Sequence, residues 1–133
     1  MVRVYYEDTD AGGVVYYANY LKFAERARTE VLREIGYEHK DNEKNHGINF
    51  VVRLCNIEFY KPGLLDDLLE VQTEILAVRG ASIRMRQSIK KQSQVLALLE
   101  IKLACIGSNG NVMRIPLKLR NRISGLIFVK GDG

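Results

Sequence analysis

The chain has 133 residues, of which 47% are hydrophobic and 27% charged, and its net charge is +4. This length can bury a real hydrophobic core, so we expect residues 1–133 to form one domain. The two histidines and two cysteines leave almost no ligands for a zinc site, so we expect neither metal nor cofactor. The small, dispersed basic excess fits an anionic small molecule as well as it fits nucleic acid.

The N-terminus lacks a signal-peptide pattern, and no window approaches the roughly 20 apolar residues of a membrane-spanning helix. We therefore expect a soluble cytoplasmic protein. Cys55 and Cys105 lie within apolar, strand-like runs, which favours two reduced thiols in the core over a disulfide.

A short strand over residues 2–6 and a long helix over residues 16–35 are predicted for the first third of the chain. The helix carries apolar residues at spacings of three and four, which predicts one buried stripe of Tyr17, Tyr20, Leu21, Ala24, Ala27, Val31 and Ile35. Gly36 is a good terminating residue. The polar residues 37–47 predict a surface connection.

Four longer strands are predicted after the helix, at residues 48–60, 68–79, 82–91 and 94–107, with the last one central because it is almost wholly apolar. Turn residues separate them, and short connections favour antiparallel neighbours. Residues 113–122 predict a further edge strand, and residues 124–133 fit no element. A sheet with one apolar face and one long helix indicates a two-layer α+β domain.

The run from Tyr5 to Tyr20, Y-Y-E-D-T-D-A-G-G-V-V-Y-Y-A-N-Y, is the strongest candidate for a functional site. It places carboxylates and two glycines just before the helix. Unpaired N–H groups at a helix N-terminus stabilise a developing oxyanion, and an upstream carboxylate supplies a base or nucleophile. From the residues alone, a plain loop or helix-capping acid is the commoner role for an acid in the place of Asp10, and Glu25 is a weaker alternative catalytic acid.

This motif, together with F-A-E-R-A-R-T-E, the run from Ile57 to Ile75 and R-G-A-S, resembles the hotdog-fold acyl-CoA thioesterases. The nearest group is the YbgC type, related to 4-hydroxybenzoyl-CoA thioesterase. The resemblance implies a five-stranded antiparallel sheet wrapped around one long central helix. It also implies hydrolysis of an acyl-CoA to a free acid and CoA, homodimers or homotetramers with sites at subunit interfaces, and a link to lipid metabolism and the Tol-Pal system.

The resemblance also assigns roles to individual residues. Asp10 is the expected nucleophile or general base, and the backbone N–H of Tyr17 or a close neighbour polarises the thioester carbonyl. The substrate-binding residues expected around them are Gly12, Gly13, Val14 and Asn19. Basic side chains are expected to meet the CoA phosphates, and the candidates are Arg79, Arg84, Lys90, Lys91, Arg114 and Lys118.

The chain departs from YbgC-type members at Tyr17, where they usually carry histidine. The backbone N–H is kept, so activity is still expected, with a possible change in acyl preference. Two alternatives stay open. One is another hotdog enzyme, either a thioesterase acting on acyl carrier protein or a dehydratase. The other is a non-catalytic acyl-CoA-binding or scaffold protein. A dehydratase is expected to need a histidine, and His39 and His46 both lie in the polar connection. No nucleic acid is expected as a partner.

Overall fold

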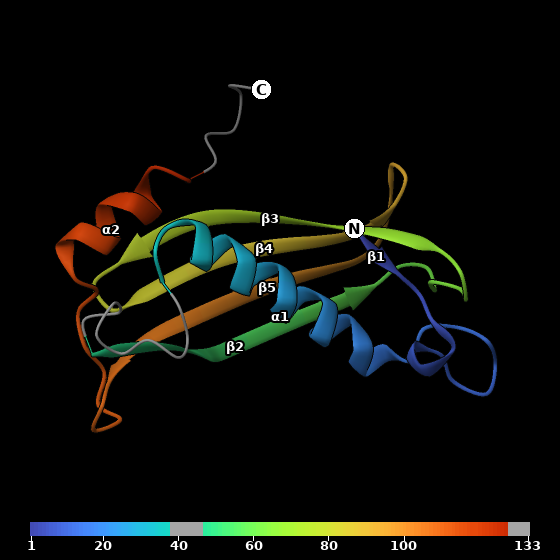
Figure 1. The fold of residues 1–133 in the computed structure, drawn as a ribbon, viewed down its shortest axis with the longest axis horizontal. Coiled ribbons are helices and arrows are strands. Elements are labelled where there is room, and N and C mark those ends of the chain that lie inside the picture. The colour runs from blue at the N-terminus through green and yellow to red at the C-terminus, as the bar shows by residue number, and fades with distance from the viewer. Residues whose placement is uncertain (38–46, 128–133) are drawn as a thin grey trace.

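The computed structural model describes residues 1–37 and 47–127, which form a five-stranded antiparallel sheet and two helices (Figure 1). The elements follow in the order β1 Val2–Arg3, a short 3-10 helix Tyr6–Asp8, α1 Tyr17–Glu34, β2 Ile48–Phe59, β3 Leu68–Arg79, β4 Ser82–Lys91, β5 Gln94–Gly107 and α2 Leu117–Ser124. The predicted long helix and long strands are confirmed, but β1 is only two residues long.

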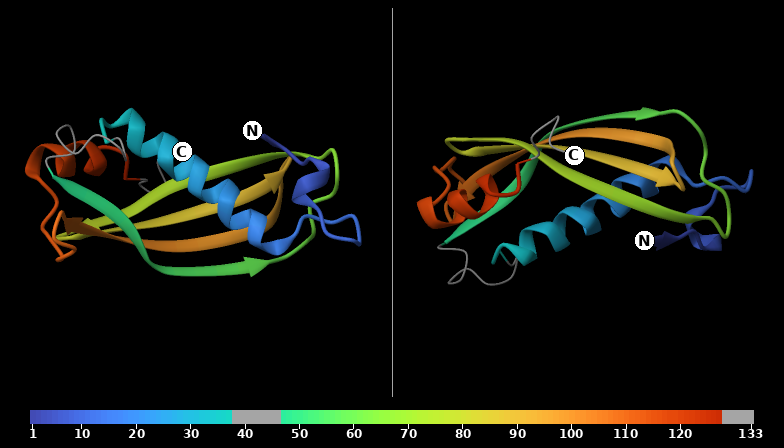
Figure 2. Two further views of the ribbon diagram at one scale, coloured as in Figure 1. Left: turned by 60° about the horizontal axis from the view of Figure 1, so that its bottom comes forward. Right: turned by 90° about the horizontal axis from the view of Figure 1, so that it is seen from above.

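Helix α1 lies across one face of the curved sheet, and both views of Figure 2 show the sheet bending around it. Its buried side chains face this sheet, and they are Asn19, Tyr20, Phe23, Ala24, Arg28 and Leu32. The predicted stripe was therefore partly wrong, because Tyr17 and Leu21 are exposed. Phe23 and Leu32 take their places, so the buried face is rotated from the predicted one.

The strand order is β1-β3-β4-β5-β2, so β2 pairs with β5 and not with β3. The prediction that consecutive strands would be neighbours fails at this one connection. Residues 60–67 instead cross the end of the sheet and place β3 on the far side of β4 (Figure 2). As predicted, β5 is an interior strand, since it pairs with both β4 and β2.

Residues 117–124 form helix α2, which corrects the predicted edge strand over residues 113–122. The physical reason is that β5 already has a neighbour on each side and offers no free edge to the chain that follows it. Leu119 and Ile123 are the buried residues of α2. Arg122 donates to the carbonyl of Ile35 at 3.1 Å, which ties α2 to the end of α1.

Two smaller predictions also change. Cys105 is buried but Cys55 is exposed, because Cys55 lies in the largely exposed second half of the edge strand β2. Tyr37 begins the predicted surface connection yet is buried, and its hydroxyl accepts a hydrogen bond from the Phe50 N–H at 3.0 Å.

His39 and His46 lie outside the described residues. Within the described ranges, no helix is long and apolar enough to cross a membrane.

Candidate active site

The acidic loop closes on itself around Asp10. The Asp10 N–H donates to the Val14 carbonyl at 2.9 Å, and the Gly13 N–H donates to the Asp10 carbonyl at 3.1 Å. The Asp10 side chain accepts a bond from the Gly12 N–H at 2.8 Å, which fixes the direction of an otherwise exposed carboxylate. Gly13 has a φ of +80°, a conformation that glycine adopts without steric cost. The predicted group of Asp10, Gly12, Gly13 and Val14 therefore forms one turn.

Helix α1 begins immediately after this turn. The carbonyl of Asp8 accepts from the Tyr16 N–H at 2.8 Å and from the Asn19 side-chain amide at 2.9 Å. The N-cap residue of the helix, Tyr16, makes no capping bond through its side chain. In the part of the chain that the structure describes, the N–H groups of Tyr17 and Ala18 have no acceptor. They are donors at the positive end of the helix dipole, free to bind an oxyanion.

The connection at residues 60–67 supports the acidic loop from the other side. The Val15 N–H donates to the Gly63 carbonyl at 2.7 Å, and Val14 forms an antiparallel bridge with Leu64. The Gly63 N–H in turn donates to the Tyr20 hydroxyl at 2.9 Å. The start of α1 and this connection therefore hold each other in place.

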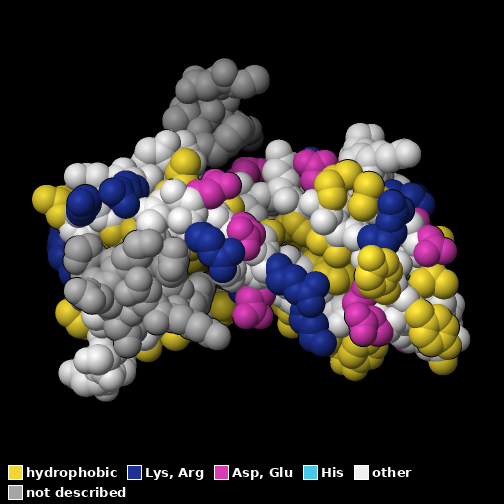
Figure 3. Space-filling model, viewed as in Figure 1, with side chains coloured by type: hydrophobic (Ala, Val, Ile, Leu, Met, Phe, Trp, Pro, Cys, Tyr) yellow, Lys and Arg dark blue, Asp and Glu magenta, His cyan; other side chains and the backbone are white. Residues whose placement is uncertain are grey.

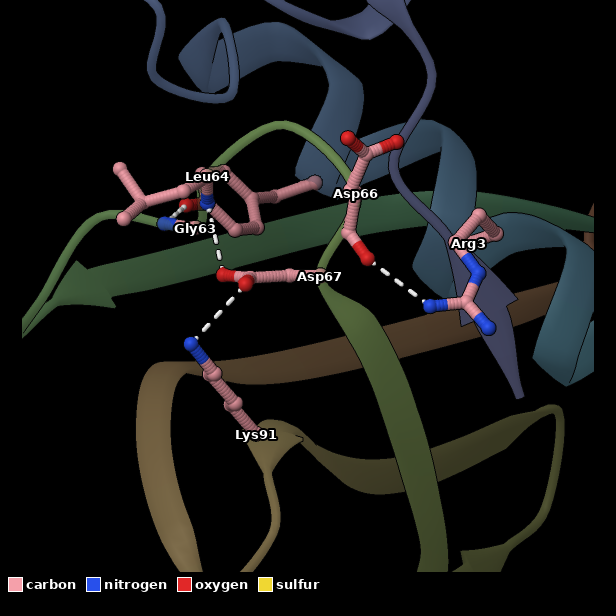
Figure 4. A network of polar contacts seen from close by, with 7 residues as sticks. Arg3, Gly63, Leu64, Asp66, Asp67 and Lys91 are labelled. Carbon is pink, nitrogen blue, oxygen red and sulfur yellow. Dashed lines mark hydrogen bonds and ion pairs between the residues drawn. The ribbon is translucent and has the colours of Figure 1, made fainter.

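A second set of bonds fixes the same connection to the strands (Figure 4). Asp67 accepts from the Leu64 N–H at 2.9 Å and forms an ion pair with Lys91 at 2.9 Å. Arg3 donates to the Asp66 carbonyl at 2.8 Å. Burial acts to raise the pKa of the Asp67 carboxyl, but the bonds from Lys91 and Leu64 and the Lys91 charge together hold this pKa below its ordinary value.

A pocket of about 240 Å³ opens beside the helix start, lined by Val15, Tyr17, Tyr20, Phe59, Tyr60, Lys61 and Pro62. Tyr17 is 62% exposed and its ring packs against Tyr16 at 4.7 Å between centroids. Tyr16 is also exposed. Hydrophobic side chains gather at this end of the molecule (Figure 3), so the pocket lies in an apolar surface.

The structure thus brings Asp10, Gly12, Gly13, Val14 and the Tyr17 N–H to one end of the molecule. Asn19 is different, because it is 7% exposed and its amide is bonded to the Asp8 carbonyl, so it supports the loop.

Sequence reasoning missed Tyr20 and Asp67 as supporting residues. Pro62 and Gly63 are turn-forming residues between two predicted strands, but the sequence does not show that this connection meets the helix start. Across the described residues, no group of side chains has the composition of a metal site.

An antiparallel sheet curved around one long helix, with an acidic loop at the helix start, is the architecture of a hotdog-type thioesterase. The chain belongs to the thioesterase superfamily, whose model matches residues 12–98. It is 44% identical over 122 residues to the acyl-CoA thioester hydrolase YbgC of Escherichia coli, covering 91% of this chain and 84% of that one.

Solved structures agree with this membership. A probable thioesterase from Bartonella henselae superimposes with a TM-score of 0.81 at 38% identity, over 86% of this chain and 95% of that one. A gentisyl-coenzyme A thioesterase gives a TM-score of 0.82 at 28% identity, over 92% and 96% of the two chains. The hotdog fold and the family predicted from the motif are confirmed.

Proposed function

We propose that this protein hydrolyses acyl-CoA thioesters, with Asp10 as the catalytic carboxylate. The observation that carries the proposal is an exposed, oriented carboxylate beside a helix start that has free N–H groups. Family membership supports the same reaction, since the relative from Escherichia coli is named an acyl-CoA thioester hydrolase.

In this mechanism the thioester carbonyl oxygen binds the N–H of Tyr17 or Ala18, which stabilises the negative charge that forms as the carbonyl is attacked. Asp10 acts in one of two ways. As a nucleophile it forms a mixed anhydride and releases the CoA thiolate, and water then hydrolyses the anhydride. As a general base it takes a proton from a water molecule that attacks the carbonyl directly, and the C–S bond then breaks and releases the CoA thiolate. The bond from Gly12 orients the carboxylate in either case.

We further propose that the active unit contains two copies joined along β2. This strand is an edge of the sheet, and from Val51 onward it is largely exposed. Its exposed apolar side chains, together with the residue that follows it, are Val51, Val52, Leu54, Phe59 and Tyr60. An exposed apolar edge of this length is a template for pairing with another strand.

The decisive test replaces Asp10 by asparagine and follows CoA release with a thiol reagent over short, long and aromatic acyl-CoAs. We expect Asp10→Asn to lower kcat by roughly 10²–10⁴, the range for loss of a general base or acid. Glu7→Gln is the matched control, because Glu7 is also an exposed carboxylate of this segment, and it should retain activity. Turnover by Asp10→Asn at the wild-type rate contradicts the assignment.

Two further outcomes separate the alternatives. No CoA release by the wild-type protein with any acyl group would favour the scaffold reading. After a single turnover in ¹⁸O-labelled water, ¹⁸O in the Asp10 carboxylate would establish the nucleophilic route, because the label enters there only when water attacks an anhydride at the Asp10 carbonyl carbon. The general-base route puts the label only in the released acid.

A further inference from the structure

Arg28 is a buried cation on α1 with no carboxylate partner among the described residues. Its side chain is on the sheet side of the helix and the residue is 9% exposed. One guanidinium nitrogen donates to the Gln87 side-chain oxygen at 3.0 Å. The Gln87 amide is itself fixed by bonds to the Ala24 carbonyl at 2.9 Å and the Thr73 hydroxyl at 3.0 Å. The guanidinium is therefore held in one orientation by a neutral group.

A buried charge is costly unless it is paired. Burial lowers the pKa of the Arg28 guanidinium, an effect that the nearby Glu25 charge opposes. No described side-chain nitrogen or oxygen that is fully buried lacks a partner. The guanidinium N–H groups that make no bond within the chain must therefore reach solvent.

Arg28 lines a pocket of about 330 Å³ between α1 and β2. Its lining is Glu25, Arg28, Thr29, Leu32, Phe50, Val51, Val52 and Leu103. Leu32, Phe50 and Leu103 supply apolar surface, whereas Arg28 supplies hydrogen-bond donors that are already oriented. Glu25 and Thr29 add polar surface to this pocket, so it is apolar only in part. A half-apolar pocket with a fixed guanidinium fits a ligand whose apolar chain ends in a carboxylate, which arginine binds with two parallel hydrogen bonds.

The two pockets lie at opposite ends of β2. The pocket near Asp10 is lined by Phe59 at the end of the strand, and the Arg28 pocket is lined by Phe50 near its start. When an antiparallel edge strand pairs with its own copy around a two-fold axis, the end of one strand faces the start of the other. The pocket near Asp10 then lies beside the Arg28 pocket of the second copy.

We propose that Arg28 of a second copy completes the acyl-binding site and binds a carboxylate at the end of the acyl group remote from the thioester. The substrates favoured are therefore acyl-CoAs of dicarboxylic acids. This rests on the proposed function and on pairing through β2. Thioester hydrolysis takes place at Asp10 of one copy, while Arg28 of the other decides which acyl groups are held there.

The first test compares adipoyl-CoA with hexanoyl-CoA, which have the same chain length and differ in the terminal carboxylate. Arg28→Met should lower kcat/KM for adipoyl-CoA by roughly 10- to 100-fold, the value of a hydrogen bond to a charged group. It should change hexanoyl-CoA hydrolysis little. Arg28→Lys should keep part of the preference, and Arg26→Met is the control, since Arg26 is an exposed arginine of the same helix.

Equal loss for both substrates in Arg28→Met and Arg28→Lys would overturn the proposal, because it would mean that Arg28 only maintains the fold. Unchanged adipoyl-CoA hydrolysis in Arg28→Met would overturn it as well. So would a wild-type protein that hydrolyses hexanoyl-CoA and rejects adipoyl-CoA.

The second test mixes subunits. Dimers formed from one Asp10→Asn copy and one Arg28→Met copy contain one site in which both residues are intact, provided that Arg28 serves the other copy's Asp10. Adipoyl-CoA hydrolysis should then rise above that of either parent. No rise in verified mixed dimers would overturn the assignment to the second copy. Full activity of Asp10→Asn alone would instead contradict the proposed function, so the two failures are distinguishable.

Discussion

The backbone N–H of Gly63 donates a hydrogen bond of 2.9 Å to the hydroxyl of Tyr20, a residue of helix α1 that is almost completely buried. The Gly63 carbonyl accepts from the Val15 N–H on its other side at 2.7 Å. A Cβ atom at Gly63 would lie 3.0 Å from a Val15 methyl and 3.4 Å from the Tyr20 oxygen. The connection, the acidic loop and the helix therefore meet at a point where only glycine fits without displacement.

Replacing Tyr20 by phenylalanine should destabilise the protein by about 1–3 kcal/mol, because a buried N–H is left without an acceptor. A shift in the midpoint of urea denaturation measures this change, provided that the slope of the unfolding free energy against urea concentration stays the same. Tyr6→Phe is the matched control, since Tyr6 is highly exposed, and it should stay within about 0.5 kcal/mol of the wild type. Equal midpoints for Tyr20→Phe and Tyr6→Phe would show that the Gly63 bond contributes nothing.

The Asp67–Lys91 pair should make stability depend on pH at the acid end. The pKa of Asp67 is held below its ordinary value of 3.8, so its folded form favours the charged carboxylate. This contribution is complete above the pKa of the unfolded chain and is lost as the pH falls through the lower folded pKa. Asp67→Asn should therefore be less stable at pH 7, and the difference from wild type should shrink on acidification.

Denaturant titrations at pH 7, 5 and 3 test this for wild type and Asp67→Asn. The pair is partly exposed, so the difference at pH 7 should be about 1 kcal/mol or less. Asp66→Asn is the control, because Asp66 bonds to Arg3 and Val4 through its backbone carbonyl and N–H. A gap between wild type and Asp67→Asn that stays constant over this range would exclude the titration of Asp67 as its cause.

Local patterns predicted most of the secondary structure. The apolar run of β5 and the glycine after α1 are features of the nearby chain, and both interpretations were correct. The acidic loop could also be predicted as a unit, since Asp10 and Gly12 are two residues apart and bond directly. The family resemblance then predicted that the sheet wraps around the long helix.

Features set by distant parts of the chain were not predictable in the same way. Whether residues 60–67 form a hairpin or a crossing depends on which strand β5 pairs with, and turn residues do not encode this choice. The same holds for Tyr20, whose hydroxyl acquires a partner 43 positions away. Arg28 is charged and is not a member of the predicted apolar stripe, and its buried position is accompanied by a bond to Gln87 on β4, 59 positions away.

Gly12→Ala should lower activity with little loss of stability. A Cβ at this position would lie 3.2 Å from the Asp10 carboxylate oxygen, which is tighter than a normal contact, so the exposed carboxylate should move and weaken its bond to the Gly12 N–H. A misplaced catalytic group costs up to about 10²-fold in rate. Steady-state kinetics with one acyl-CoA, alongside urea denaturation, measures both effects.

Gly13→Ala provides the contrast at the next residue. Its Cβ would meet no atom within 4 Å, but its φ of +80° is unfavourable for alanine, so this variant should lose stability by about 1 kcal/mol. The opposite pattern, with activity lost only in Gly13→Ala, would contradict the role given to the Asp10–Gly12 bond.

Leu54→Lys should both separate the two copies and reduce activity. Leu54 lies near the middle of β2 and is 49% exposed on an edge that we propose to be paired, and lysine on an edge strand opposes strand addition. Analytical ultracentrifugation should show a monomer where the wild type is a dimer or tetramer. Leu117→Lys is the matched control, because Leu117 is 71% exposed on α2, which contacts β3 on the other side of the sheet from β2, and it should leave both association and activity unchanged. If Leu54→Lys still assembles like the wild type and keeps full activity, the two copies do not associate through β2.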